Sequence, residues 1–474
     1  MSISLVTPSN ESSGPVDEVE QLRKEIKIAV VTPTHDTRYL METFESLKLQ
    51  TYRNWEWFIM VNHPSGAPVE LERLRIEVSL IVEHFDGPKI HLFADAMALA
   101  PGQGVGLRKS AAFRAAIEAV NPDVLVELDH DDLLVPSALE KVAKAFRDDP
   151  EVDFVYSDAA YFEPEGKPQG TPSYMRPQVR REWEKNGFEF YEANIEGFRP
   201  GKYVCVRAFE PSPVSFSTVF WAPDHVRAWR RDFYQSVGGY NPAMEFCDDH
   251  ELLCKTYVEG RKLVHLSEPL YLYRHSTTNT WESKAQRIRE LTYQVENRFI
   301  VPMAVRDAKR RGLKVLVLGD DPEVLKNDNP QRIVGADVWN DGGLTRFTPE
   351  SSVGLVHAHD VIGQIKDPMN FMRDVYRVLA PGGILHVRTP STDGRGAFQD
   401  PRNVSFWNQN SFWYWTREAQ RSFLPEAYQH VRFQVIVLDT WYPSEWHKQN
   451  MIPYVDAHLV ALKDGWVGPG MDVT

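Results

Sequence analysis

The sequence has few cysteines and no long apolar run. Only three cysteines occur in 474 residues, and no two of them form a Cys-x-x-Cys pair. This scarcity speaks against a disulfide framework and a thiolate metal site, and it fits a reducing cytoplasm. The N-terminus lacks the basic start and apolar core of a secretion signal. No apolar run reaches the roughly 18 to 20 residues that a membrane-spanning helix needs. We therefore expect a soluble, cytoplasmic protein without an integral membrane segment.

The chain also has fewer basic than acidic residues. The chain carries 53 Lys and Arg against 66 Asp and Glu, which gives a formal net charge of -13. A nucleic-acid partner needs a clustered basic surface, so this acidic balance argues against one. The hydrophobic share of 42% and the charged share of 25% are those of an ordinary globular protein. The length exceeds that of one compact domain, and we expect two domains with separate cores.

Apolar strand signals alternate with helix-period stretches, which is typical of an α/β fold with a parallel sheet. The expected strands lie near 26–31, 55–61, 89–93, 124–128, 314–318, 353–359 and 384–387, and the expected helices near 39–49, 70–83, 107–120 and 368–379. A charged, helix-period stretch, interrupted by Pro302, indicates a linker. The expected parts are a polar N-terminal extension at 1–25, a first domain at 26–280, a helical linker at 281–312 and a second domain at 313–474.

One stretch of the first domain breaks this rhythm. Between Glu163 and Pro213 the Pro, Gly and charged content rises and the periodicity fades. Such a change predicts an inserted, partly irregular segment rather than more sheet. We expect a loop that covers the substrate there.

Two carboxylates, Asp129 and Asp131, stand directly after an expected buried strand. The carboxyl ends of parallel strands border the crevice in which ligands bind. Two oxygen donors two residues apart can hold a hard divalent cation that keeps positions open for phosphate oxygens. The alternative is a helix N-cap, because Asp132 precedes a helix expected to start near Pro136. The motif alone leaves both interpretations open.

The order of further motifs resembles glycosyltransferase family 2 over roughly residues 26–280. The matching stretches are 29–36, 47–56, 106–111, 128–132, 237–241, 247–252 and 269–280. The resemblance implies an α/β fold of the GT-A type, a nucleotide-diphospho-sugar transferase domain with a Rossmann-like mixed sheet. A smaller methyltransferase-like α/β domain follows the linker helix.

The resemblance also implies roles for individual residues. Contacts to the nucleotide sugar are implied for Pro33, Thr34, Asp36, Asn62, Arg108, Asp129 and His130. A site for Mn²⁺ or Mg²⁺ is implied at Asp131, Asp129 and His275. Asp249 is the implied catalytic base, with Asp248 beside it where the family usually has glutamate. On the acceptor side, the residues to consider are Trp221, His225 and Gly239.

Several of these residues have structural alternatives. The aspartate pair can open a helix as an N-cap, which is compatible with catalysis at the same place. His275 can be a structural histidine, since its spacing is not diagnostic of a metal ligand. Arg108 and Lys109 can neutralise a diphosphate or can be solvated helix charges. Asn62 stands where many relatives carry an Asp-Asp-x-Ser run; its amide offers a donor and an acceptor to uracil, which favours a UDP-sugar.

From about residue 314 to 416 the chain is similar to class I S-adenosylmethionine-dependent methyltransferases, chiefly at 352–359, 374–383 and 399–412. The loop after its first strand, Leu318–Pro322, holds only one glycine, so binding of S-adenosylmethionine is not expected. We expect a non-catalytic docking domain. His357 and His359 are expected to be ordinary strand residues, and the aromatic cluster at 406–415 is expected to be core.

The sequence thus predicts an inverting, metal-dependent glycosyltransferase that moves a sugar from a nucleotide-sugar donor, with a UDP-sugar favoured, to a glycan, protein or other hydroxyl acceptor. Two alternatives stay open. One is a bifunctional glycosyltransferase and methyltransferase, and the other is a catalytically silent scaffold or carbohydrate-binding protein. The sugar, the acceptor and the formation of a homo-oligomer are not determined by the sequence.

Overall fold

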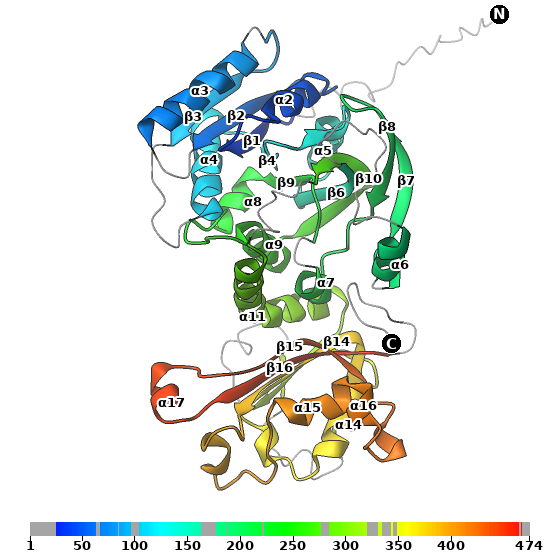
Figure 1. The fold of residues 1–474 in the computed structure, drawn as a ribbon. Helices are drawn as coiled ribbons and strands as arrows, with labels where there is room; N and C mark the ends of the chain where they lie inside the picture. The colour runs from blue at the N-terminus through cyan, green and yellow to red at the C-terminus, as the bar shows by residue number, and fades with distance from the viewer. Residues whose placement is uncertain are drawn as a thin grey trace, which may run out of the picture.

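The computed structural model describes residues 25–62, 67–83, 85–95, 104–162, 177–185, 187–219, 222–275, 284–319, 330–333, 343–344, 348–463 and 466. Two α/β units are stacked on either side of a long helix, α11 (Ala285–Arg310), as Figure 1 shows. The α/β expectation is confirmed for both units. Among the helices of the described ranges, none combines the length and the apolar character needed to cross a membrane.

The first sheet begins with a parallel half. Its strands are β1 (Ile28–Thr34), β2 (Trp55–Asn62), β3 (Ile90–Asp95) and β4 (Val124–Glu127), in the order β3-β2-β1-β4. These strands are almost continuously apolar because both faces of the sheet are covered. In register, Val31 lies beside both Phe58 and Glu127, so the three carboxyl ends meet at one edge.

The other half of this sheet mixes directions. β9 (Arg227–Arg230) is antiparallel to β4 and to β6 (Val152–Phe162), β6 is parallel to β10 (Lys262–Arg274), and β5 (Leu133–Leu134) is antiparallel to β10. The first unit therefore has the mixed sheet that the GT-A expectation requires.

The segment 163–213 contains more sheet than expected. β7 (Phe190–Ile195) and β8 (Gly201–Val206) form an antiparallel hairpin that pairs with β6, and α6 (Pro177–Lys185) precedes it. The prediction of a segment without sheet was wrong here, because pairing with β6 supplies order that the mixed local pattern does not show. Residues 163–176, where a covering loop was expected, lie outside the described residues.

Helices pack on both faces of the first sheet. They are α2 (Leu40–Lys48), α3 (Pro68–Val82), α4 (Val105–Val120), α5 (Ala138–Asp148), α7 (Pro213–Thr218), α8 (Arg231–Ser236) and α9 (Asp248–Glu259). In α5 the buried residues are Ala138, Leu139, Val142, Ala143 and Phe146, one apolar stripe at helical spacing. The stripe packs into the core that contains β1 and β2, and the opposite face of the sheet shares its core with α4, α9 and α11.

The linker helix α11 is uninterrupted, whereas the sequence predicted a break at Pro302. A proline inside a helix removes one hydrogen bond and crowds the preceding turn, so the expectation followed the local rule. Here Ile300, Met303 and Ala304, on both sides of the proline, are fully buried between the two units, and this packing holds the helix together.

The second sheet has the order β12-β11-β13-β14-β16-β15. Its strands are β11 (Lys314–Gly319), β12 (Pro330–Ile333), β13 (Val353–His359), β14 (Leu379–Pro390), β15 (Phe433–Trp441) and β16 (Tyr454–Ala461). Short helices accompany them: η3 (Ile362–Gln364), α14 (Pro368–Val378), η4 (Gly396–Phe398), α15 (Gln409–Thr416), α16 (Glu418–Arg421), η5 (Glu426–Tyr428) and α17 (Glu445–Gln449).

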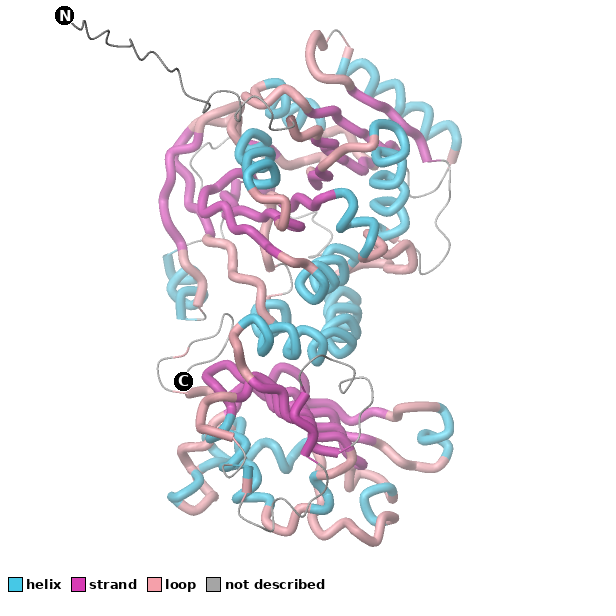
Figure 2. Tube along the Cα trace, turned by 180° about the vertical axis from the view of Figure 1, so that it is seen from behind, coloured by secondary structure: helices cyan, strands magenta, loops and turns pink. Residues whose placement is uncertain are grey.

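The two faces of this sheet have different partners. Val356 and Leu385 point into a core shared with α14 and α15, whereas Leu355 and Ile384 point into the core that contains α11. Figures 1 and 2 show α14, α15 and α16 on the far side of the sheet and α11 on the side of the first unit. One face of the second unit is therefore covered by the linker helix.

Candidate active site

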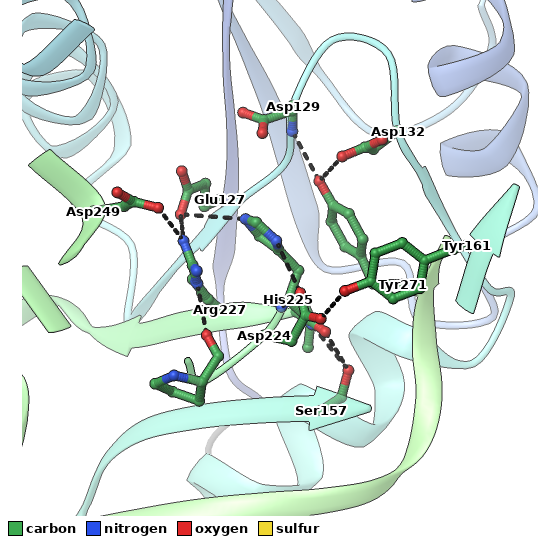
Figure 3. A network of polar contacts seen from close by, with 12 residues as sticks. Glu127, Asp129, Asp132, Ser157, Tyr161, Asp224, His225, Arg227, Asp249 and Tyr271 are labelled. Carbon is green, nitrogen blue, oxygen red and sulfur yellow. Dashed lines mark hydrogen bonds and ion pairs between the residues drawn. The ribbon is translucent and has the colours of Figure 1, made fainter. Parts of the chain in front are cut away.

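The loop after β4 is tied to β10 by Asp132. This carboxylate is 1% exposed and accepts hydrogen bonds from the Tyr271 hydroxyl at 2.8 Å and from the Arg274 backbone N–H at 2.6 Å. The Tyr271 oxygen also accepts from the Asp129 backbone N–H at 3.2 Å (Figure 3). The helix-cap interpretation of Asp132 was wrong: α5 begins at Ala138 behind Ser137, and Asp132 binds a strand far along the chain instead.

Arg274 closes the same loop from the other side. Its Nε donates to the Asp131 carbonyl at 2.5 Å and its Nη2 to Glu42 at 2.8 Å. The guanidinium lies between two rings, 4.1 Å from the centroid of Tyr39 and 4.5 Å from that of Phe162. The arginine is 1% exposed. Such a clamp fixes the backbone on which Asp129 and Asp131 stand.

The side chains of Asp129 and Asp131 are the open carboxylates of this loop. Both are half-buried, and within the described ranges neither carboxylate accepts a hydrogen bond from another side chain. Burial raises the pKa of Asp131, and the neighbouring Asp129 raises it further. Two hard oxygen donors with unused lone pairs suit a divalent ion that also takes phosphate oxygens.

His275 follows the clamp directly, and its backbone N–H donates to the Phe162 carbonyl at 2.8 Å. Within the described part of the chain, no three His, Cys, Asp or Glu side chains are close enough together to hold a metal ion by themselves. His275 therefore does not complete a preformed three-ligand cage with Asp129 and Asp131.

The residues expected near the nucleotide lie at the carboxyl ends of β1 and β2. Thr34 donates to the Asp36 carbonyl at 2.6 Å, and Asp36 in turn holds Arg38 by a backbone bond of 2.8 Å and an ion pair of 3.2 Å. Pro33 precedes them in β1. Across the loop, the His130 ring stands edge-on to His35, with centroids 5.1 Å apart.

Asn62 and Arg108 form a buried pair. Asn62 is 3% exposed and Arg108, in the first turns of α4, is 8% exposed. The guanidinium donates to Asn62 Oδ1, which leaves the amide nitrogen as the group that Asn62 can offer to a base. The interpretation of Arg108 as a solvated helix charge was wrong.

Lys109 is buried as well and points to a different partner. Its ammonium pairs with Glu127, the last residue of β4, and lies 3.9 Å from Asp248 Oδ2. Burial lowers the pKa of Lys109, but Glu127 and Asp248 together raise it well above its usual range. The solvated interpretation was therefore wrong here too, and this charge is already committed to carboxylates of the protein.

Asp248 and Asp249 occupy the first turn of α9, which begins behind Cys247. Neither is the N-cap, but both lie where the helix dipole favours negative charge. Asp249 Oδ2 accepts from Arg227 Nη1 at 2.9 Å and its side chain is 33% exposed, whereas Asp248 is 4% exposed. Burial, with Asp249 nearby, raises the pKa of Asp248 to about 7. Although burial opposes it, Arg227 and Lys109 hold the pKa of Asp249 well below its usual range.

His225 lies between the loop after β4, which carries Asp129 and Asp132, and Asp249 (Figure 3). Its ring stacks on Tyr271 with centroids 4.7 Å apart, and Nε2 is 4.0 Å from Glu127 Oε2. Gly239, with φ +56, packs against the Tyr234 ring, so a side chain there would be strained. Trp221 lies outside the described residues.

The arrangement brings most of the predicted residues to one edge of the first sheet. Asp129, after β4, and Asp249, on α9, both act electrostatically on the buried Lys109, so the two segments lie on either side of one buried cation. Motif reading missed Glu127, Arg227 and Arg274. A signal was present for Glu127, because it ends the apolar run of β4, where a buried charge needs a partner.

The aromatic cluster of the second unit is only partly buried. Trp407, Phe412 and Trp415 are buried, as predicted for core, but Phe406 and Tyr414 are 49% and 41% exposed. Tyr414 lies on the short helix α15, where only every third or fourth side chain faces the sheet, and Phe406 lies in the loop before this helix. His357 and His359 lie on β13. The glycine-poor loop at 320–322 lies outside the described residues.

Comparison with known proteins gives two family matches. Residues 103–204 match the family described as Glycosyl transferase family 2, and residues 304–387 match the family described as Methyltransferase domain. The first span runs from α4 into β8 and includes the loop after β4, and the second runs from the end of α11 into β14.

Curated relatives are distant and much longer. The chain is 23% identical over 279 residues to the O-antigen biosynthesis protein RfbC of Myxococcus xanthus, covering 55% of this chain and 17% of the relative. It is 24% identical over 263 residues to the uncharacterized protein y4gI of Sinorhizobium fredii, covering 54% of this chain and 23% of the relative. The chain thus spans less than a quarter of the length of either relative.

Similar solved structures include S. aureus TarS 1–349 in complex with UDP-GlcNAc, at 14% identity and a TM-score of 0.38, covering 60% of this chain and 73% of that one. The mannosyltransferase PcManGT from Pyrobaculum calidifontis, in complex with GDP-Man and Mn²⁺, is 16% identical with a TM-score of 0.33, covering 64% and 68%. The family matches thus show similarity to glycosyltransferase family 2 at residues 103–204, followed by similarity to a methyltransferase domain at residues 304–387.

Proposed function

We propose that the chain is an inverting, metal-dependent glycosyltransferase that moves a sugar from a nucleotide-sugar donor to a hydroxyl acceptor on a glycan, a protein or another molecule. The supporting observation is a contrast within the loop after β4, residues 129–132, which we call the metal loop. Asp132 and the loop backbone are tied down by Tyr271 and Arg274, while the carboxylates of Asp129 and Asp131 are left open. A loop of this kind is built to present two oxygen donors.

The donor is proposed to bind at the carboxyl ends of β1, β2 and β4. Pro33, Thr34, Asp36 and Asn62 border the nucleotide, and the Asn62 amide nitrogen is suited to donate to a uracil carbonyl, which favours a UDP-sugar. Asp131 and Asp129, with His130 beside them, face the diphosphate, and His275 is a further candidate ligand.

The donor set fits Mn²⁺ or Mg²⁺, since hard cations take carboxylate oxygens and retain positions for phosphate. When bound, such an ion neutralises the charge that develops on the departing diphosphate. Lys109 is not proposed for that task, because Glu127 and Asp248 already hold it.

Asp249 is proposed as the general base. Its partly exposed carboxylate takes the proton from the acceptor hydroxyl while that oxygen bonds to the anomeric carbon. The bond between the anomeric carbon and the diphosphate oxygen breaks in the same displacement, so the configuration inverts. Gly239, His225 and Trp221 are proposed to border the acceptor, and residues 313–474 are proposed to act without methyl transfer.

Thermal unfolding tests the proposal. We expect UDP with Mn²⁺ to stabilise the protein by about 2.7 kcal/mol at a hundred times its Kd, an increase of roughly 5 to 10 °C in Tm, and GDP or dTDP to stabilise it less. Asp131→Asn should abolish the Mn²⁺-dependent part, whereas the control Asp148→Asn, at an exposed carboxylate, should keep it. Asp249→Asn should bind UDP normally and lose release of UDP from the donor. If no nucleotide with Mn²⁺ shifts the Tm, the proposal fails and the silent scaffold is favoured.

A further inference from the structure

The carboxylate proposed as the base, Asp249, accepts two hydrogen bonds from the protein. Asp249 Oδ2 accepts a hydrogen bond of 2.9 Å from Arg227, and Asp249 Oδ1 accepts one of 2.8 Å from the His250 backbone N–H. The two contacts fix both oxygens of the carboxylate. One third of the side chain remains exposed, which leaves a path for an acceptor.

Arg227 is itself held rigidly. The residue is 1% exposed on β9, and its Nε donates to the Pro223 carbonyl at 3.1 Å. Its Nη1 is also 3.9 Å from Glu127 Oε2 (Figure 3). A guanidinium that is bonded at Nε to a carbonyl and at Nη1 to a carboxylate has a single orientation, because its donors are arranged in a fixed plane.

Glu127 is the shared anion between two buried cations. It is 0% exposed, pairs with Lys109 and lies near Arg227, while the two cations reach Asp248 and Asp249 respectively. Two cations therefore face three carboxylates. Burying an unbalanced charge is costly, and Asp248, whose pKa is about 7, is the carboxylate that takes up a proton. Asp249 stays the anionic member.

We propose that Arg227 is a positioning residue for the transfer step, which orients Asp249 and keeps it unprotonated, and that Glu127 and Lys109 hold Arg227 in place. This inference rests on the proposed function and names the group that prepares its base. The groups that face Asp249 are Arg227 from β9, Lys109 from α4, Glu127 from β4, and Asp248 and His250 on α9 itself.

A structural role and a positioning role differ in their pH dependence. Removing an adjacent cation raises the pKa of a carboxylate by about one to three units. The acid limb of kcat/KM should therefore move to higher pH when Arg227 loses its charge. A lysine keeps the charge but not the planar bonds to Pro223 and Asp249, so it should preserve the limb and lower kcat.

The experiment measures UDP release from the UDP-sugar that stabilises the protein most, with Mn²⁺ and with water as acceptor, between pH 4.5 and 9. We expect Arg227→Gln to lower kcat about 100-fold and to bring the Asp249 limb, which lies below pH 4.5 in the wild type, up toward or into the measured range. Arg227→Lys should lower kcat with the limb unmoved. Arg230→Gln is the matched control, because Arg230 lies on the same strand but donates to the carbonyls of Phe146, Asp149 and Val152 and stacks over the Phe146 ring.

The outcomes separate the two proposals. Wild-type protein that releases no UDP from any donor overturns the proposed function and this inference with it. An active wild type whose Arg227→Gln variant keeps kcat and the acid limb overturns the inference alone. A loss of kcat shared by Arg227→Gln and Arg230→Gln, with no change in the limb and with weakened UDP binding, assigns Arg227 a structural role and also overturns it.

Discussion

Replacing Arg274 with alanine should destabilise the first unit strongly. The change removes the hydrogen bonds to the Asp131 carbonyl and to Glu42, together with the stacking against Tyr39 and Phe162. Breaking a buried ion pair costs about 3–5 kcal/mol. Glu42 keeps both oxygens paired to Arg199, at 2.8 Å each, so it is not left as an unpaired charge and the lower end of that range applies.

A loss of about 3 kcal/mol corresponds to a fall in Tm of roughly 6 to 12 °C for a unit of this size. Differential scanning fluorimetry of the full chain measures it, and UDP titration in Mn²⁺ measures whether the metal loop keeps its shape. The control is Arg75→Ala, which removes an exposed bidentate pair with Glu72 and should leave the Tm nearly unchanged, because solvent screens such a pair. A fall in Tm below 3 °C, equal to that of the control, would refute the argument that the clamp shapes the loop.

Other changes give distinct results. Burial raises the pKa of Glu296 to about 8. Between about pH 4.5 and 8 the folded state therefore holds a proton that the unfolded state has lost, so the stability should fall as the pH rises through that window. Glu296→Gln should abolish this decrease of Tm with pH. Residues 313–474 expressed alone should aggregate on size-exclusion chromatography, because the face with Leu355 and Ile384 loses its cover. Tyr271→Phe should cost about 1–3 kcal/mol by chemical denaturation, since buried Asp132 and the Asp129 N–H lose a partner.

The place of Asp129 and Asp131 in the fold could be predicted because it depends on the local alternation of strands and helices. An apolar strand followed by Asp129 and Asp131 places those carboxylates at a sheet edge whatever the rest of the chain does. The hydrogen-bond partners of Asp132 could not be predicted in the same way. A helix cap needs only the next few residues, whereas the observed partners, Tyr271 and Arg274, are well over a hundred residues away.

The β7–β8 hairpin and the course of α11 were hidden for a related reason. Residues 190–206 have a weak alternating pattern, and their order comes from pairing with β6. Pro302 obeys a local rule that normally ends a helix, but burial on both sides outweighs it. The network of Lys109, Glu127 and Arg227 gave only the hint of charges within apolar segments. Which carboxylate meets which cation is decided by tertiary packing, which no local pattern encodes.

The one-sided cover of the second sheet limits how the two units can move. Opening a hinge between them would expose Leu355 and Ile384 to water together with the α11 residues that cover them, so rotation carries a hydrophobic cost that a polar linker would not impose. The carboxyl edges of the two sheets thus keep a nearly constant separation. A molecule that contacts both edges would have to match this fixed spacing in length.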